Sequence, residues 1–183
     1  MSVLADFQVW LVGVLRQDTP ISEFMHTAWA WPIAESLHFF GLCVLIGTVG
    51  TFDLRLLGFA SRVPIAVVHR LIPWGLLGFA LNAATGALFL MTEPAQYIYN
   101  PAFHLKLAFL AVAGLNASAF YLTSYRHVFG SQAMLVAPAR AKLIAAVSLC
   151  MWVAIIVCGR LITFYRPGVC AEGATAMILT CAP

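Results

Sequence analysis

The sequence predicts an all-α integral membrane protein, an up-down four-helix bundle preceded by an N-terminal amphipathic surface helix. Composition gives the first reason, because 62% of the 183 residues are hydrophobic and only 9% are charged, whereas a soluble domain carries roughly 25% charged residues. Four apolar stretches give the second, because each is long enough to cross a bilayer, which takes about 20 residues. The connections between them are short, which favours antiparallel neighbours.

Residues 1–30 form a separate N-terminal segment. In it Phe7, Trp10 and Val14 recur at helical spacing, with Asp6 on another face. This pattern predicts an amphipathic helix that lies along the membrane surface. A plain hydrophobic tether explains the same residues. Pro20 follows residues that cap helices and predicts the start of a second short surface helix.

The predicted bundle, residues 31–166, contains spans at about 32–57, 68–91, 102–124 and 139–165. Proline marks several of their ends. Pro73 lies in the first turns of the second span and Pro101 opens the third, positions at which a missing amide proton costs little. Pro167 stops the fourth span. Residues 167–183 then form a C-terminal tail.

Basic residues predict the orientation of the bundle. Six of the ten flank the first and third loops, on one side of the predicted bundle: Arg55, Arg62, Arg70, Arg126, Arg140 and Lys142. The positive-inside rule places this side in the cytoplasm. We therefore expect a multi-pass protein of the bacterial inner membrane with both termini in the periplasm.

The five cysteines fall into two groups. Cys43, Cys150 and Cys158 lie inside predicted spans, where cysteine packs as a small apolar residue. Cys170 and Cys181 lie in the tail on the expected periplasmic side, where an oxidising compartment allows a disulfide. We predict that these two cysteines pair.

Polar side chains inside the spans are the candidate functional residues, because a central charge costs roughly 2.5 to 3.5 kcal/mol there. Glu35 and His38 in the first span and His104 and Lys106 in the third all lie in the expected outer half. The depths of the two histidines differ by about 5 Å at 1.5 Å per residue. Since the first and third helices face each other in such a bundle, His38 and His104 are candidate axial ligands of a b-type haem.

A polar cluster without a cofactor explains the same four residues. Glu35 and His38 are three residues apart on one helix and can interact. Lys106 can pair with Glu35 from the facing helix. In the haem hypothesis, Lys106 instead lies near a haem propionate or a quinone oxygen. Both hypotheses stay open at this point.

Two further histidines lie near the cytoplasmic ends of the spans. His69 begins the second span and His127 follows the third, so a second haem or a metal ion could use them. The alternative is that both are solvated interface residues, because the fourth helix has no histidine to complete a second diagonal pair. Asn82 and Asn116 lie near the midplane on adjacent helices and are expected to form an interhelical hydrogen bond through their side-chain amides.

A set of short motifs runs through residues 28–165. Its residues are Trp31-Pro32, Glu35, His38, Gly41, Asp53-Leu54-Arg55-Leu56-Leu57-Gly58, Pro73-Trp74, Gly78-Phe79, Thr85-Gly86, Asn100-Pro101, Phe103, Lys106, Ala113-Gly114, Asn116-Ala117 and Gly159-Arg160. The set resembles a family of small bacterial four-helix membrane proteins defined only as a domain of unknown function. That resemblance implies the architecture and gives weight to Glu35, His38 and Lys106.

More distantly, the layout is similar to copper-resistance D-type membrane proteins and to cytochrome b561-type haem bundles. In the b561 pattern, histidine pairs on facing helices hold a haem near each membrane surface. His38 and His104 match one such pair by position. The second pair is incomplete, which argues against a relay of two haems across the membrane.

Three functions follow from these residues. The first is a b-type haem membrane subunit that passes electrons between quinone and a periplasmic redox partner, rather than a stand-alone enzyme. The second is a copper or small-solute transporter that uses His26, His38 and Met91 near its outer mouth. The third is a structural anchor subunit of a larger membrane complex. The sequence contains no nucleotide-binding loop, no nucleophile with an assembled base and no basic patch suited to nucleic acid.

Overall fold

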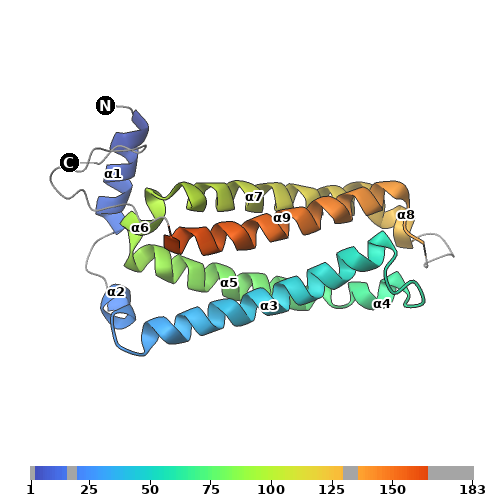
Figure 1. Ribbon diagram of the computed structural model, residues 1–183, viewed down its shortest axis with the longest axis horizontal. Helices are drawn as coiled ribbons and strands as arrows, with labels where there is room; N and C mark the ends of the chain where they lie inside the picture. The colour runs from blue at the N-terminus through green and yellow to red at the C-terminus, as the bar shows by residue number, and fades with distance from the viewer. Residues whose placement is uncertain (1–2, 16–19, 130–135, 165–183) are drawn as a thin grey trace.

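The structure is a computed structural model that describes residues 3–15, 20–129 and 136–164. Every regular element in these ranges is a helix. Four helical segments are long and apolar enough to cross a membrane, and they lie side by side (Figure 1). The chain is therefore a multi-pass membrane protein whose long helices lie in a lipid bilayer.

The four long helices are α3 (Ala30–Leu57), α5 (Ile72–Thr92), α7 (Pro101–Ala119) and α9 (Ala139–Phe164), and they confirm the four predicted spans. Two spans are longer than predicted. The short helix α4 (Ile65–His69) extends the second, and α7 continues through the π-helix η1 (Phe120–Ser124) into α8 (Tyr125–Phe129). Both extensions contain polar or basic residues, which in the sequence resemble the end of a span. The helix can continue through them because long basic side chains can reach the membrane interface from within a helix.

The helices pack in two pairs joined along one side. Helix α3 packs along α5, α7 packs along α9, and α3 also contacts α9. At one end of the long helices lie α1 (Val3–Leu15), α2 (Pro20–Met25) and α6 (Pro94–Ile98), and at the other end lie α4 and α8 (Figure 1). We refer to these as the α6 end and the α8 end.

Glycine permits the close contact between α3 and α5. A Cβ atom at Gly78 would lie 2.7 Å from the carbonyl oxygen of Gly41, and a Cβ atom at Gly41 would lie 2.9 Å from the carbonyl oxygen of Gly78. A Cβ atom at Gly75 would lie 2.6 Å from the hydroxyl oxygen of Thr48. These small residues let the two backbones touch, which is how helices gain packing energy in a bilayer.

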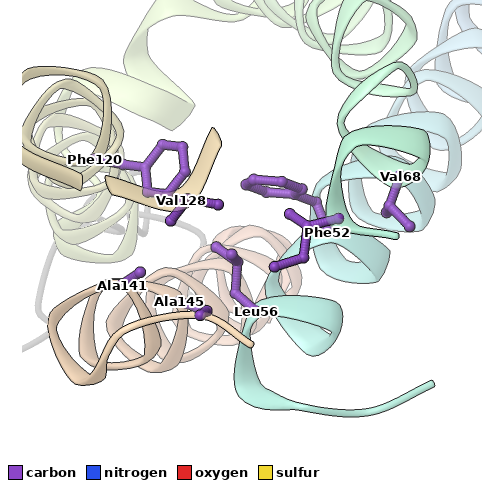
Figure 2. Close-up of a cluster of buried hydrophobic side chains, with 9 residues drawn as sticks. Phe52, Leu56, Val68, Phe120, Val128, Ala141 and Ala145 are labelled. Atoms are coloured by element: carbon purple, nitrogen blue, oxygen red, sulfur yellow. The ribbon is translucent and has the colours of Figure 1, made fainter. Parts of the chain in front are cut away.

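Two groups of buried apolar side chains hold the ends of the long helices. The larger one lies toward the α8 end (Figure 2), and its members are Phe52, Leu56, Ile65, Val68, Phe120, Val128, Ala137, Ala141 and Ala145. The smaller one lies at the α6 end and consists of Met25, Ala30, Ala34 and Phe89. Many other apolar side chains of the long helices are exposed, as expected for residues that face lipid.

The N-terminal helices α1 and α2 are too short to cross a membrane. Helix α1 lies across the α6 end (Figure 1) and contacts α6, where Gln8 Nε2 donates a hydrogen bond to Ile98 O at 3.3 Å. It buries Val12 and leaves Phe7 and Trp10 exposed. Helix α2 begins at Pro20, as predicted.

Asn100 fixes the start of α7, as the Asn-Pro motif predicts. Its side chain is fully buried, and its Oδ1 accepts a hydrogen bond from the Ala102 amide at 3.0 Å. Its Nδ2 donates to Ile162 O of α9 at 3.1 Å. The same residue therefore caps α7 and attaches it to the C-terminal part of α9.

Candidate functional site

His38 is the best-defined polar residue inside the long helices. It lies on α3, is half-buried, and its Nδ1 is 2.8 Å from Thr85 Oγ1 on α5. Asn82 of α5 donates from Nδ2 to His38 O at 2.7 Å. Helix α5 therefore holds both the imidazole ring and the backbone at this position.

The hydrogen bonds of Thr85 favour one tautomer of His38. Thr85 is 3% exposed, and its hydroxyl lies 2.8 Å from Leu81 O and 3.2 Å from Asn82 O. When the hydroxyl proton is directed to one of these carbonyl groups, Thr85 Oγ1 accepts a hydrogen bond from His38 Nδ1–H. This tautomer leaves His38 Nε2 with a lone pair that can bind a metal ion or accept a proton.

Lys106 brings a positive charge to the same region. It lies on α7, is half-buried, and its ammonium group interacts with His38 on α3 and Cys158 on α9. A Cβ atom at Gly159 would lie 3.8 Å from Lys106 Nζ, and a Cβ atom at Gly86 would lie 3.7 Å from His38 Cε1. A glycine, which has no side chain, thus lies beside each of these two side chains, Gly159 of α9 beside Lys106 and Gly86 of α5 beside His38.

No carboxylate neutralises Lys106 among the residues that the structure describes. Glu35, the partner expected in the polar-cluster hypothesis, is exposed and forms no ion pair with Lys106. Its charge acts instead on Tyr97 of α6. Burial, followed by the negative charges of Glu93 and Glu35, raises the pKa of Tyr97 from 10.0 to about 12.

His104 does not join this site. It is exposed and its ring lies beside that of the adjacent Phe103, with 6.4 Å between ring centroids. Residues two positions apart on an α-helix point about 200° apart at 3.6 residues per turn. Since Lys106 faces the other long helices, His104 faces away from them. The charge of Lys106 thus acts on His38, whereas His104 lies outside this site.

The two histidines at the α8 end have different neighbours. His69 lies among the rings of Phe52, Tyr121, Tyr125 and Phe129, at centroid distances of 4.9 to 6.0 Å, and its Nε2 is 3.2 Å from Tyr121 Oη. His127 is exposed, and its Nδ1 donates to Thr123 O at 3.0 Å. In the described ranges, no group of three or more His, Cys, Asp and Glu side chains could hold a metal ion.

The remaining predicted contacts are partly tested. Asn82 and Asn116 each donate an interhelical hydrogen bond, but to backbone carbonyl groups rather than to each other: Asn82 to His38 O, and Asn116 to Ile144 O at 2.9 Å. Cys43, Cys150 and Cys158 are unpaired. Cys170 and Cys181, the predicted disulfide, lie outside the described residues.

The sequence analysis named Thr85 among the motifs but gave it no role, and it missed Tyr97. Threonine inside an apolar helix is common because its hydroxyl can form a hydrogen bond to its own helix backbone, so its presence alone did not indicate a contact with His38. The signal that was available is the spacing of Asn82 and Thr85, three residues apart on one face of α5, which is the face that meets His38. Tyr97 resembles an ordinary interface aromatic residue in the sequence.

Comparison with known proteins found no matching family model, no matching curated protein and no matching solved structure. The resemblance drawn from the motifs stays a prediction, and function must be argued from the site itself.

Proposed function

We propose that this protein is the membrane subunit of a redox system and that His38 and Lys106 bind the polar head of a quinone. One observation carries the proposal: the charge of Lys106, a half-buried ammonium group without a carboxylate partner in the described residues, acts on His38, whose Nδ1 is hydrogen-bonded to Thr85. Quinones dissolve in the bilayer, and both side chains are half-buried in helices that lie there.

The chemistry of the two side chains matches the two oxidation states of this ligand. The ammonium group of Lys106 donates hydrogen bonds and would bind a quinone carbonyl oxygen. The bare Nε2 of His38 would accept a hydrogen bond from a hydroxyl group of the reduced quinol. The electrons would pass to a redox partner protein in the periplasm.

We further propose that the four long helices form an up-down bundle in the bacterial inner membrane, with both termini in the periplasm. The six basic residues that predict this orientation lie in the last turn of α3, beside α4, in α8 and in the first turn of α9, all of them near the α8 end. Helix α1 would lie on the periplasmic surface as an amphipathic helix, with Phe7 and Trp10 in the lipid.

A b-type haem is the second candidate ligand. The hydrogen bond from His38 to Thr85 favours it, since a metal-bound histidine usually donates its second ring N–H to a protein acceptor. His38 therefore fits as one axial ligand. His104 does not fit as the other, because it is exposed on α7 and faces away from the other long helices.

Quinone binding to the purified protein in lipid nanodiscs tests the proposal. A short-tailed quinone is titrated and its binding is followed by tryptophan fluorescence. Loss of a hydrogen bond to a charged group costs about 1.5–3 kcal/mol, so Lys106→Met should weaken binding about 10- to 100-fold, and His38→Ala should also weaken it. Lys142→Met and His104→Ala are the matched controls and should bind as the wild type does.

Equal binding by all five proteins would overturn the quinone proposal. The visible spectrum of the same samples tests the second candidate. A haem absorption band that disappears in both His38→Ala and His104→Ala would replace quinone by bis-histidine haem, whereas no haem band in any sample would exclude it.

A further inference from the structure

Asp53 is the buried acid of the long helices that the proposed site does not use. It lies near the C-terminal end of α3, on the α8 side, and is 5% exposed. Its Oδ2 is buried and has no hydrogen-bond partner, and no other buried side-chain oxygen or nitrogen in the described residues shares this state. The position therefore demands an explanation of its own.

The neighbouring cation does not neutralise Asp53. Arg55 is 2% exposed, and its guanidinium group donates to Val63 O and to Ser61 O, the latter at 3.1 Å. Arg55 follows Asp53 by two residues on α3, so the two side chains point about 200° apart around the helix axis. Arg55 thus fastens α3 to the loop before α4, on the other side of the helix.

The element packed against Asp53 offers a neutral partner. Helix α9 contacts α3, and its Ser148 hydroxyl faces the Asp53 carboxyl group. The Ser148 hydroxyl can donate a hydrogen bond to one carboxyl oxygen, but it carries no positive charge. The basic residues of α9 nearest to the α8 end, Arg140 and Lys142, lie more than one helical turn before Ser148 in the chain.

A charged carboxylate is poorly supported in these surroundings. Burial removes the water that would solvate the charge, and a carboxylate oxygen without a donor loses the free energy of a hydrogen bond in addition. The last carbonyl groups of α3 carry partial negative charge and repel an anion at this end of the helix. A proton on the carboxyl group removes all three penalties.

We propose that Asp53 is a proton-binding site within the membrane, a carboxylic acid at neutral pH that takes its proton from water at the α8 end. The end of α3 is four residues away, or about 6 Å along the helix. A proton fits better than a metal ion, because the described residues contain no group of three or more His, Cys, Asp and Glu side chains. This inference does not depend on quinone binding.

Infrared spectroscopy of the full chain in nanodiscs tests it. At neutral pH the wild type should show the carbonyl band of a protonated carboxyl group, and the band should shift when aspartate is labelled with carbon-13. Asp53→Asn should lose this band, while Asp6→Asn, a change at an exposed aspartate of α1, should keep it.

Isotope labelling needs no variant, so the result stands even if Asp53→Asn fails to fold. Absence of a label-sensitive band at neutral pH would mean a charged carboxylate and would overturn the proposal. A band that is present with choline chloride and disappears with sodium chloride at the same pH would also overturn it, since the site would then bind a sodium ion.

Discussion

The close contact between α3 and α5 makes a quantitative prediction for Gly78→Ala. The added Cβ atom would lie 2.7 Å from Gly41 O and 2.8 Å from Leu45 N. Both neighbours are backbone atoms of α3, so no side chain can rotate to make room. The helices must separate by several tenths of an ångström along their best-packed surface.

The expected loss follows from two opposing effects. Overpacking costs typically 1–3 kcal/mol, with the upper part of this range for a backbone clash. Alanine favours a helix over glycine by about 1 kcal/mol, so Gly78→Ala should lower the free energy of unfolding by about 1–2 kcal/mol. Gly114→Ala on α7 is the matched control, because its Cβ atom would meet nothing within 4 Å. It should gain up to about 1 kcal/mol.

Reversible unfolding in mixed detergent micelles measures both variants against the wild type. We expect the free energies of unfolding of Gly78→Ala and Gly114→Ala to differ by about 1–3 kcal/mol and to change in opposite directions from the wild type. Because Asn82 and Thr85 follow Gly78 on α5, the first variant should also weaken quinone binding. Equal stability of the two variants would refute the claim that α3 and α5 touch at this point.

Three further predictions concern single side chains. Asn100→Ala removes the cap of α7 and the bond to Ile162 O, so thermal unfolding should show a loss of about 2 kcal/mol or more; an unchanged midpoint would contradict both roles. Lys106→Met removes a half-buried charge and should stabilise the protein by up to about 3 kcal/mol while it weakens quinone binding, whereas Lys142→Met should do neither. The pKa of Tyr97 is higher in the folded state than in the unfolded state, so its contribution to the free energy of unfolding is present below pH 10 and is lost as the pH rises through about 12. Phenolate absorbance of the wild type minus Tyr97→Phe should show one group that titrates near 12, and titration near 10 would contradict the burial of this ring.

The sequence predicted the helices well because apolar length and terminal residues are local properties. Asn100 and Pro101 marked the start of α7, and Pro20 marked the start of α2. The longer second and third spans were missed because a helix can continue past polar residues at a membrane interface, and the π-helix at Phe120–Ser124 has no clear sequence signal.

The site was predicted only in part. The wrong placement of His104 in it could have been avoided from the sequence. His104 and Lys106 are two residues apart, so helical geometry alone prevents both from facing the same partner helices. The prediction was based on the similar depth of His38 and His104 in the membrane and did not consider the direction in which each side chain points from its helix. The role of Thr85 depends on how closely α3 approaches α5, which is a tertiary property that a single sequence does not show.

Photolabelling tests the central claim most directly. The protein in nanodiscs is irradiated with a quinone that carries a photoreactive azide on its ring, and the labelled peptides are identified by mass spectrometry. If His38 and Lys106 bind the quinone head, label should concentrate on α3 around His38 and on α7 around Lys106, and an excess of unmodified quinone should prevent it. Label spread along the lipid-facing surface, unaffected by that excess, would contradict the proposed site.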